Sequence, residues 1–277
     1  MKLWALFAVP FALAAVSTSH ATSDGTNSPP HIAAAQDQDS IDAPKTPQQV
    51  AEMRAEIYMA RKDYSEAALA FQRLLDQNPG SAEYMNKIGI AYQELGQDSL
   101  AEHFYKRALK ADKKSSHALN NLGTIEYSRQ RFGKAVKYYR RAIDANGDNQ
   151  APIYSNLGYA YCELKSYPKA TEAFGKALAL DPTVFEPKGS AGTIIQHRST
   201  DDYGTLYFMV AKSYAKKGDA EHTARFLKLA RDDGYKEFQS AEKDPDFASV
   251  IKDPQVQDVL RNRPPYDAQQ TGKPVRN

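Results

Sequence analysis

Apolar and small residues recur along this chain at helical spacing, and the pattern itself repeats. Each unit carries a small residue in a first predicted helix, at Ala55, Gly89, Gly123 and Gly158, which are 34, 34 and 35 residues apart. A second small residue, with an aromatic ring four positions later, keeps the same phase at Ala67 and Phe71, Ala101 and Tyr105, Ala135 and Tyr139, and Ala170 and Phe174. Series that stay in phase over four units indicate a tandem array of helix hairpins over residues 48–183.

The unit from Ala151 to Pro182 shows the pattern in full. Its packing positions are Tyr154, Leu157, Gly158, Tyr161, Ala170, Phe174, Ala177 and the closing Pro182. Small Gly158 and Ala170 allow two antiparallel helices to approach closely, while the larger side chains fill the surrounding space. This pattern resembles the tetratricopeptide repeat. The resemblance implies an all-α fold, a right-handed α-solenoid of about five helix hairpins with a C-terminal helical cap.

The third unit departs from the pattern at three positions. Glu126 stands where tyrosine is expected, Tyr127 follows one place later, and Gly147 replaces the closing proline. We expect these departures to change details of packing and to leave the repeat in place.

After the array the period breaks and then resumes. Residues 184–203 contain Pro187, Gly189 and Gly192, and they predict an insertion loop. Residues 204–237 reproduce the repeat positions and predict a divergent fifth repeat. Asp-Pro pairs at 244–245 and 253–254 are typical of an N-cap followed by proline, so residues 238–262 are expected to form capping helices. Residues 263–277 return to Pro, Gln and Gly and predict a disordered tail.

The first 47 residues predict export. Lys2 precedes an apolar run from Leu3 to Val16, and small Ser19 and Ala21 follow it, which is typical of a cleaved signal peptide over residues 1–21. The run is shorter than the ~20 residues that a membrane-spanning helix needs, so no membrane span is expected, with an uncleaved anchor as the alternative. Residues 22–47 predict a disordered linker. We expect a periplasmic protein, with secretion as the alternative.

Charge and cysteine content narrow the class of partner. The formal net charge is +2 at pH 7, so no overall excess of positive charge favours nucleic acid, and none is expected as a partner. Cys162 is the only cysteine, which excludes an intrachain disulfide; we expect it to be a packing residue.

The sequence contains no constellation of catalytic residues. Its six histidines lie far apart, without metal-ligand spacing, and no phosphate-binding loop, dinucleotide fingerprint or nucleophile elbow is present. We therefore expect a protein that is not an enzyme and that holds no cofactor and no metal.

The resemblance implies a concave groove lined by the first helices of the stacked repeats. The candidate groove residues on these helices are Asn86, Lys87, Gln93, Asn120, Asn121, Tyr127, Asn156 and Tyr159. Asn121 and Asn156 stand in equivalent Asn-Leu-Gly triplets, and an amide can both donate to and accept from an extended peptide backbone. The alternative is that each asparagine caps or bonds within its own repeat. The resulting hypothesis is a non-catalytic protein–protein interaction scaffold of the cell envelope that binds a partner peptide or protein segment.

Two further hypotheses stay open. One repeat position on the second helices is basic in four units, at Arg73, Arg107, Arg141 and Lys176, which predicts a basic stripe on the convex face. This stripe is either solvated charge or a contact for an anionic envelope polymer or lipid surface. Self-association through the solenoid ends or the 184–203 loop is the third hypothesis.

Overall fold

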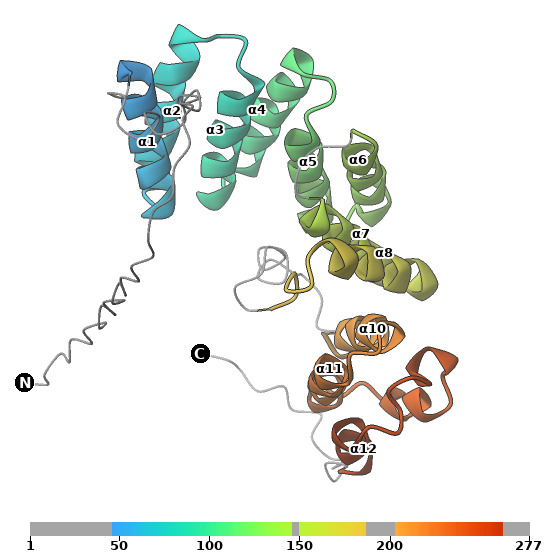
Figure 1. The fold of residues 1–277 in the computed structure, drawn as a ribbon. Helices are drawn as coiled ribbons and strands as arrows, with labels where there is room; N and C mark the ends of the chain where they lie inside the picture. Colours follow the sequence, from blue (N-terminus) through green and yellow to red (C-terminus); the bar gives the residue numbers. More distant parts are fainter. Residues whose placement is uncertain (1–45, 146–149, 187–202, 263–277) are drawn as a thin grey trace, which may run out of the picture. The chain divides into compact units, whose positions relative to one another are not determined.

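The computed structural model describes residues 46–145, 150–186 and 203–262, and all regular structure in these ranges is helical (Figure 1). The first helices of the five hairpins are α1 (Pro47–Ala60), α3 (Ala82–Glu94), α5 (Ser116–Ser128), α7 (Ala151–Glu163) and α10 (Tyr203–Lys216). The second helices are α2 (Tyr64–Gln77), α4 (Asp98–Ala111), α6 (Phe132–Asp144), α8 (Tyr167–Leu180) and α11 (Ala220–Asp232). Short 3-10 turns η1 (Phe238–Glu242) and η2 (Pro245–Phe247) and the helix α12 (Pro254–Arg261) follow. The expected all-α solenoid of consecutive hairpins is confirmed.

Local sequence fixes where the helices begin and turn. Thr46 closes a capping box with Gln49 at the start of α1, and Ser81 and Ser115 accept hydrogen bonds from the third backbone N–H groups of α3 and α5. The turns inside the hairpins use left-handed backbone, as at Gly96 with φ of 71°. Glycine adopts this conformation without steric cost, which suits it to this turn.

A glycine–aromatic contact sets the spacing of three hairpins. A Cβ atom added to Gly89, Gly123 or Gly158 would meet the ring of the aromatic residue on the second helix of the same hairpin. These rings belong to Tyr105, Tyr139 and Phe174, and all three are fully buried. The close approach expected from the sequence is therefore present in the structure.

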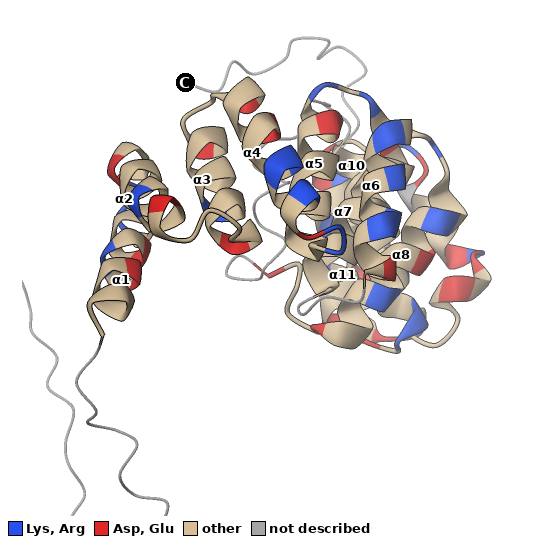
Figure 2. Ribbon diagram, turned by 90° about the horizontal axis from the view of Figure 1, so that it is seen from above, with Lys and Arg blue, Asp and Glu red and all other residues tan. Residues whose placement is uncertain are grey.

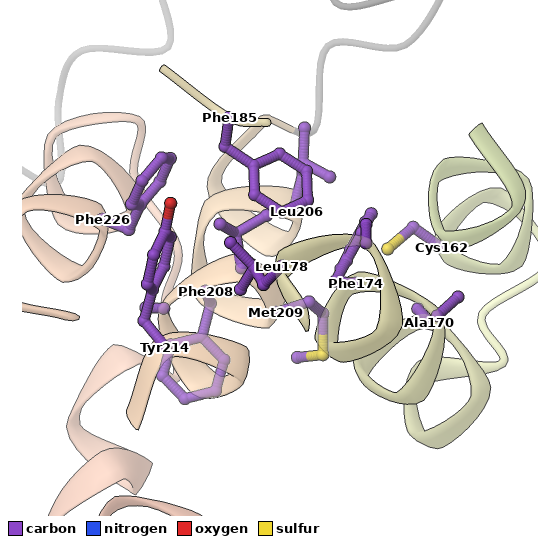
Figure 3. Close-up of a cluster of buried hydrophobic side chains, with 14 of the residues drawn as sticks. Cys162, Ala170, Phe174, Leu178, Phe185, Leu206, Phe208, Met209, Tyr214 and Phe226 are labelled. Carbon is purple, nitrogen blue, oxygen red and sulfur yellow. The ribbon is translucent and has the colours of Figure 1, made fainter. Parts of the chain in front are cut away.

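An aromatic cluster joins the fourth hairpin to the fifth (Figure 3). Phe185 lies edge-on to Phe174 at a centroid distance of 5.3 Å, and it contacts Tyr214 and Phe226 of the fifth hairpin at 6.4 Å each. Cys162 is buried at the edge of this cluster, as its small apolar character predicted. The predicted insertion therefore begins with core residues, because Val184 and Phe185 are buried before the chain leaves the described range.

The C-terminal elements cover the last hairpin on two sides. Helix α12 packs against α11, and η2 packs against α10. Phe247, Val256 and Leu260 supply the buried side chains of these contacts. Apolar surface on the final repeat of a solenoid has no following repeat to cover it, and these residues do so instead.

Several features predicted from the sequence lie outside the described residues. They are the signal peptide over 1–21, nearly all of the 22–47 linker, Gly147, residues 187–202 of the predicted insertion and the 263–277 tail. Within the part that the structure describes, no helix combines the length and the apolar character needed to cross a bilayer.

Candidate functional site

Four asparagines link three first helices through their side chains. Asn156 Nδ2 on α7 donates to Asn120 Oδ1 on α5 at 2.9 Å, and Asn121 Nδ2 on α5 donates to Asn86 Oδ1 on α3 at 3.0 Å. A longer bond of 3.4 Å, from Asn120 Nδ2 to Asn121 Oδ1, joins these two pairs. We call these residues the asparagine chain.

The asparagine chain corrects one sequence hypothesis and sharpens another. The alternative that each amide bonds within its own repeat is wrong for two of the three bonds, since they cross between repeats. The three hydrogen bonds run in one direction, from Asn156 through Asn120 and Asn121 to Asn86. The oxygen at the first end, Asn156 Oδ1, and the nitrogen at the last, Asn86 Nδ2, therefore bond no described residue. Asn86 and Asn156 are only 7% and 6% exposed, so the amides that an added peptide can reach most directly are those of the half-buried Asn120 and Asn121.

The remaining predicted groove residues have different positions. Lys87 Nζ forms an ion pair with Glu56 of the preceding repeat at 2.7 Å, and both side chains keep solvent access. Gln93 Oε1 accepts the hydroxyl of Tyr105 at 2.8 Å, so this amide anchors a core tyrosine. The Lys87 and Gln93 side chains thus have structural partners on α1 and α4.

Tyr127 and Tyr159 are core residues, which corrects their place among the groove candidates. Their side chains are 2% and 1% exposed, too little to present a ring to a ligand. Tyr159 packs edge-on against Phe174 at 5.4 Å, and the Tyr127 hydroxyl donates to Glu163 at 3.0 Å. The sequence placed both residues on the right helices, but each ring points into the hairpin.

A groove that sequence analysis missed lies beside α1. Its volume is about 710 Å³; Met53, Ile57 and Phe71 supply apolar surface, and acidic residues at the rim include Glu52 and Glu83. At one edge of the groove the Tyr84 hydroxyl contacts Glu52. The pKa of Tyr84 is raised mainly by burial and, to a smaller extent, by this contact. The signal was present in the sequence, since Val50, Met53 and Ile57 recur at helical spacing and remain exposed.

The corresponding face of α10 is covered by the chain itself. Lys212 Nζ lies 2.6 Å from Asp244 and 3.1 Å from Asp246, and Lys216 lies 3.3 Å from Asp246. The Phe208 ring packs at a tilt against the fully buried Phe247, with a centroid distance of 5.5 Å. Phe208 stands three residues before Ala211, as Asn86 and Asn120 stand three residues before Gly89 and Gly123. Residues 244–247, here called the C-terminal strap, therefore occupy the position where the asparagine chain is open.

Most members of the predicted basic stripe have a partner. The guanidinium of Arg107 lies over Phe104 at 5.0 Å, and that of Arg141 lies over Tyr138 at 5.7 Å. Lys176 pairs with Glu172 at 2.8 Å, and this bond raises the pKa of the lysine. Arg73 is exposed. Whether the stripe binds an anionic surface stays a prediction.

Comparison with known proteins identifies the family. Residues 50–114 and 115–183 match the sequence profile of the tetratricopeptide repeat. Residues 50–183, which form α1 to α8, are therefore tetratricopeptide repeats. Protein–protein interaction through these repeats is the role that the match supports.

Individual relatives share part of this tetratricopeptide repeat chain. The type IV pilus assembly protein PilF of Pseudomonas aeruginosa is 28% identical over 128 residues, which are 45% of this chain and 50% of PilF. A small glutamine-rich tetratricopeptide repeat-containing protein of Mycosarcoma maydis is 30% identical over 92 residues, which are 33% of this chain and 26% of that protein. The chain therefore spans half or less of the length of these curated relatives.

Solved structures show the same fold at lower identity. The structure of Pseudomonas aeruginosa PilF superposes with a TM-score of 0.51 and 19% identity, covering 77% of this chain and 86% of that chain. The structure of PilW, described as a widely conserved type IV pilus biogenesis factor, gives a TM-score of 0.50 and 16% identity over 78% of this chain and all of that chain.

Proposed function

We propose that the first-helix face of α3, α5 and α7 binds an extended segment of a partner protein. The asparagine chain is the observation that carries this proposal. It runs across three repeats and keeps free bonding capacity, so a peptide backbone laid along it would find donors and acceptors at successive repeats. Each added bond would contribute about 0.5–1.5 kcal/mol of binding free energy.

The match to the tetratricopeptide repeat supports this proposal, and the C-terminal strap on α10 limits where the partner segment can lie. A tetratricopeptide repeat protein presents protein-binding surface rather than a catalytic site. The C-terminal strap occupies the α10 face through Lys212 and Phe208, so the partner segment would lie on α3, α5 and α7 and extend toward the apolar groove beside α1.

The two pilus proteins among the relatives suggest the first partner to test. PilF is a type IV pilus assembly protein and PilW is a type IV pilus biogenesis factor. We infer that this chain acts in an envelope assembly of that kind, and that export through residues 1–21 brings it to the periplasm. A pilus-assembly subunit is therefore the first partner that we would examine.

The test is affinity capture from an envelope extract with the wild-type chain, followed by mass spectrometry. The variant Asn121→Ala with Asn156→Ala removes all three bonds of the asparagine chain, and we expect it to lose the captured partner at unchanged helicity. The matched control is Gln77→Ala with Asn78→Ala, which removes two exposed amides at the end of α2. Equal capture by all three proteins would contradict the proposal.

A further inference from the structure

Glu126, which stands where the repeat pattern has tyrosine, lines a charged pocket between repeats. The pocket has a volume of about 560 Å³, and its lining residues come from α4, α5 and α6 and the turn before α6. They are Glu102, Lys106, Glu126, Arg131, Lys134, Lys137, Tyr138 and Arg141. Tyr161 is the equivalent of Glu126 one repeat later, and the hollow that it lines measures about 340 Å³.

Positive charge around this pocket is only partly compensated. Glu102 pairs with Lys106 at 2.5 Å and with Arg129 at 2.6 Å, which uses its two oxygens. Lys134 and Lys137 bond no described residue. Figure 2 shows Lys and Arg following one another along α6.

The N-terminus of α6 adds to this positive potential. Arg131 stands at the N-cap position without a side-chain cap, and no acidic residue lies in the first turn. In contrast, α2, α4 and α11 each place an acidic residue in their first turn. The helix dipole is positive at this end, so α6 adds attraction for an anion where acidic residues would otherwise compensate it.

Glu126 shows that a simple anion is not the best ligand. Its side chain is 10% exposed, and Oε2, which is shielded from solvent, has no hydrogen-bond partner among the described residues. The nearest cations, Arg129 and Arg131, lie 3.8 and 3.7 Å from Oε1. A buried carboxylate oxygen without a donor is unfavourable, so a ligand that brings an N–H or O–H group would relieve this cost, whereas a ligand made only of acceptors would be repelled.

We propose that this pocket binds an acidic polypeptide segment of a partner protein, as a second contact surface distinct from the asparagine chain. Carboxylates of the segment would pair with Lys134, Lys137 and Arg141. A backbone N–H or side-chain hydroxyl of the segment would donate to the Glu126 carboxylate, which lines the pocket. A polypeptide alternates donors and carboxylates along its length, and the chain belongs to a family of protein scaffolds, which together favour this class of ligand.

The test measures binding of a fluorescent decapeptide of alternating Asp and Ser to the full chain, by anisotropy at low salt. Lys134→Ala with Lys137→Ala should weaken binding about tenfold, because two charge pairs are lost. The matched control is Lys113→Ala with Lys114→Ala, two exposed lysines outside the pocket, which should stay within about twofold of wild type. Glu126→Tyr should weaken binding, because the carboxylate acceptor is lost and the hollow that Tyr161 lines in the next repeat is smaller.

Competition with other polyanions identifies the chemistry. Inorganic polyphosphate lacks donors along its chain, so it should displace the decapeptide poorly from the wild-type protein. In Glu126→Gln the difference in affinity between the peptide and polyphosphate should be smaller. Circular dichroism checks that the variants keep their helicity, and Asn121→Ala with Asn156→Ala should bind the decapeptide normally, which separates this surface from the proposed groove.

Three results would overturn the proposal. They are no peptide binding at low salt, equal competition by polyphosphate before and after Glu126→Gln, and tighter binding of a polygalacturonate oligomer than of the peptide. The last result would assign the pocket to an anionic polysaccharide.

Discussion

The first-helix faces of α5 and α10 occupy the same place in their hairpins, but among the described residues the face of α5 is uncovered and the face of α10 is covered by the C-terminal strap. On α5, Asn120 and Asn121 reach neighbouring repeats and keep free bonding capacity. On α10, Phe208 stands at the position of Asn120 and, together with Lys212, holds the C-terminal strap. The repeat fold thus presents the same kind of face several times, and side chains decide whether it stays open.

The strap also shows which chemistry this face can hold. The Asp-Pro-Asp-Phe segment that lies on it forms a 3-10 turn, with its carboxylates on two lysines and its ring in the core. On α3 and α5 the residue that corresponds to Phe208 is an amide, Asn86 or Asn120, which suits a peptide backbone rather than a particular side chain.

The largest expected effect follows removal of the buried ring of the strap. Phe247→Ala leaves a cavity against Phe208 and should lower the free energy of unfolding of the C-terminal hairpin by about 3–5 kcal/mol. Hydrogen exchange of α10 amides measures this locally. Leu180→Ala, at a large but exposed side chain, should change exchange very little, and similar protection in both variants would show that the strap is not part of the core.

A glycine substitution tests the hairpin that supports the open face. Gly123→Ala drives a methyl group into the ring of Tyr139 and should cost about 1–3 kcal/mol of unfolding free energy, measured by urea denaturation. Gly175→Ala is the matched control, because no atom lies within 4 Å of the added Cβ in the middle of α8. That control should stabilise the helix by up to about 1 kcal/mol. A similar loss of unfolding free energy in both variants would show that the contact between Gly123 and Tyr139 is not the cause.

The ion pairs of the strap predict a pH dependence. Burial alone would raise the pKa of Asp246, but the ammonium groups of Lys212 and Lys216 lower it below its ordinary value of 3.8. A lowered carboxyl pKa gives stability that is present above the ordinary value and is lost as pH falls through the lowered one. Thermal melts should show this loss below pH 4, and Asp246→Asn should remove part of it. The same acid loss in Asp246→Asn as in wild type would count against the ion pair.

The smallest effect is expected at the asparagine chain itself. Asn156→Ala removes one bond to Asn120 and should lower the free energy of unfolding by about 0.5–1.5 kcal/mol, while Asn78→Ala should have less effect. Urea denaturation of both variants checks this. A loss of unfolding free energy several times larger would mean that the asparagine chain serves mainly to hold the repeats together and leaves little bonding capacity for a partner.

Much of the hairpin fold could be predicted from the sequence, because Gly89, Gly123 and Gly158 keep their phase with the aromatic rings that they contact. The candidate site was less accessible. Helical position placed Asn121 and Asn156 on the right face, but the bonds between repeats depend on how neighbouring hairpins pack. The same reasoning misplaced Tyr127 and Tyr159, because adjacent positions on a helix point in different directions. The strap pairs Lys212 with Asp244 across 32 residues, which periodicity does not encode.

Site-specific photo-crosslinking at two matched positions tests the central claim most directly. Ser128 on α5 and Lys216 on α10 each stand five residues after the small residue of their hairpin, and both are exposed. Ser128 lies two helical turns beyond Asn121 on the same face. A photoreactive residue at position 128 should form an adduct with a partner protein in cells that express the chain, and one at position 216 should not. Partner adducts at position 216 with none at position 128 would contradict the account.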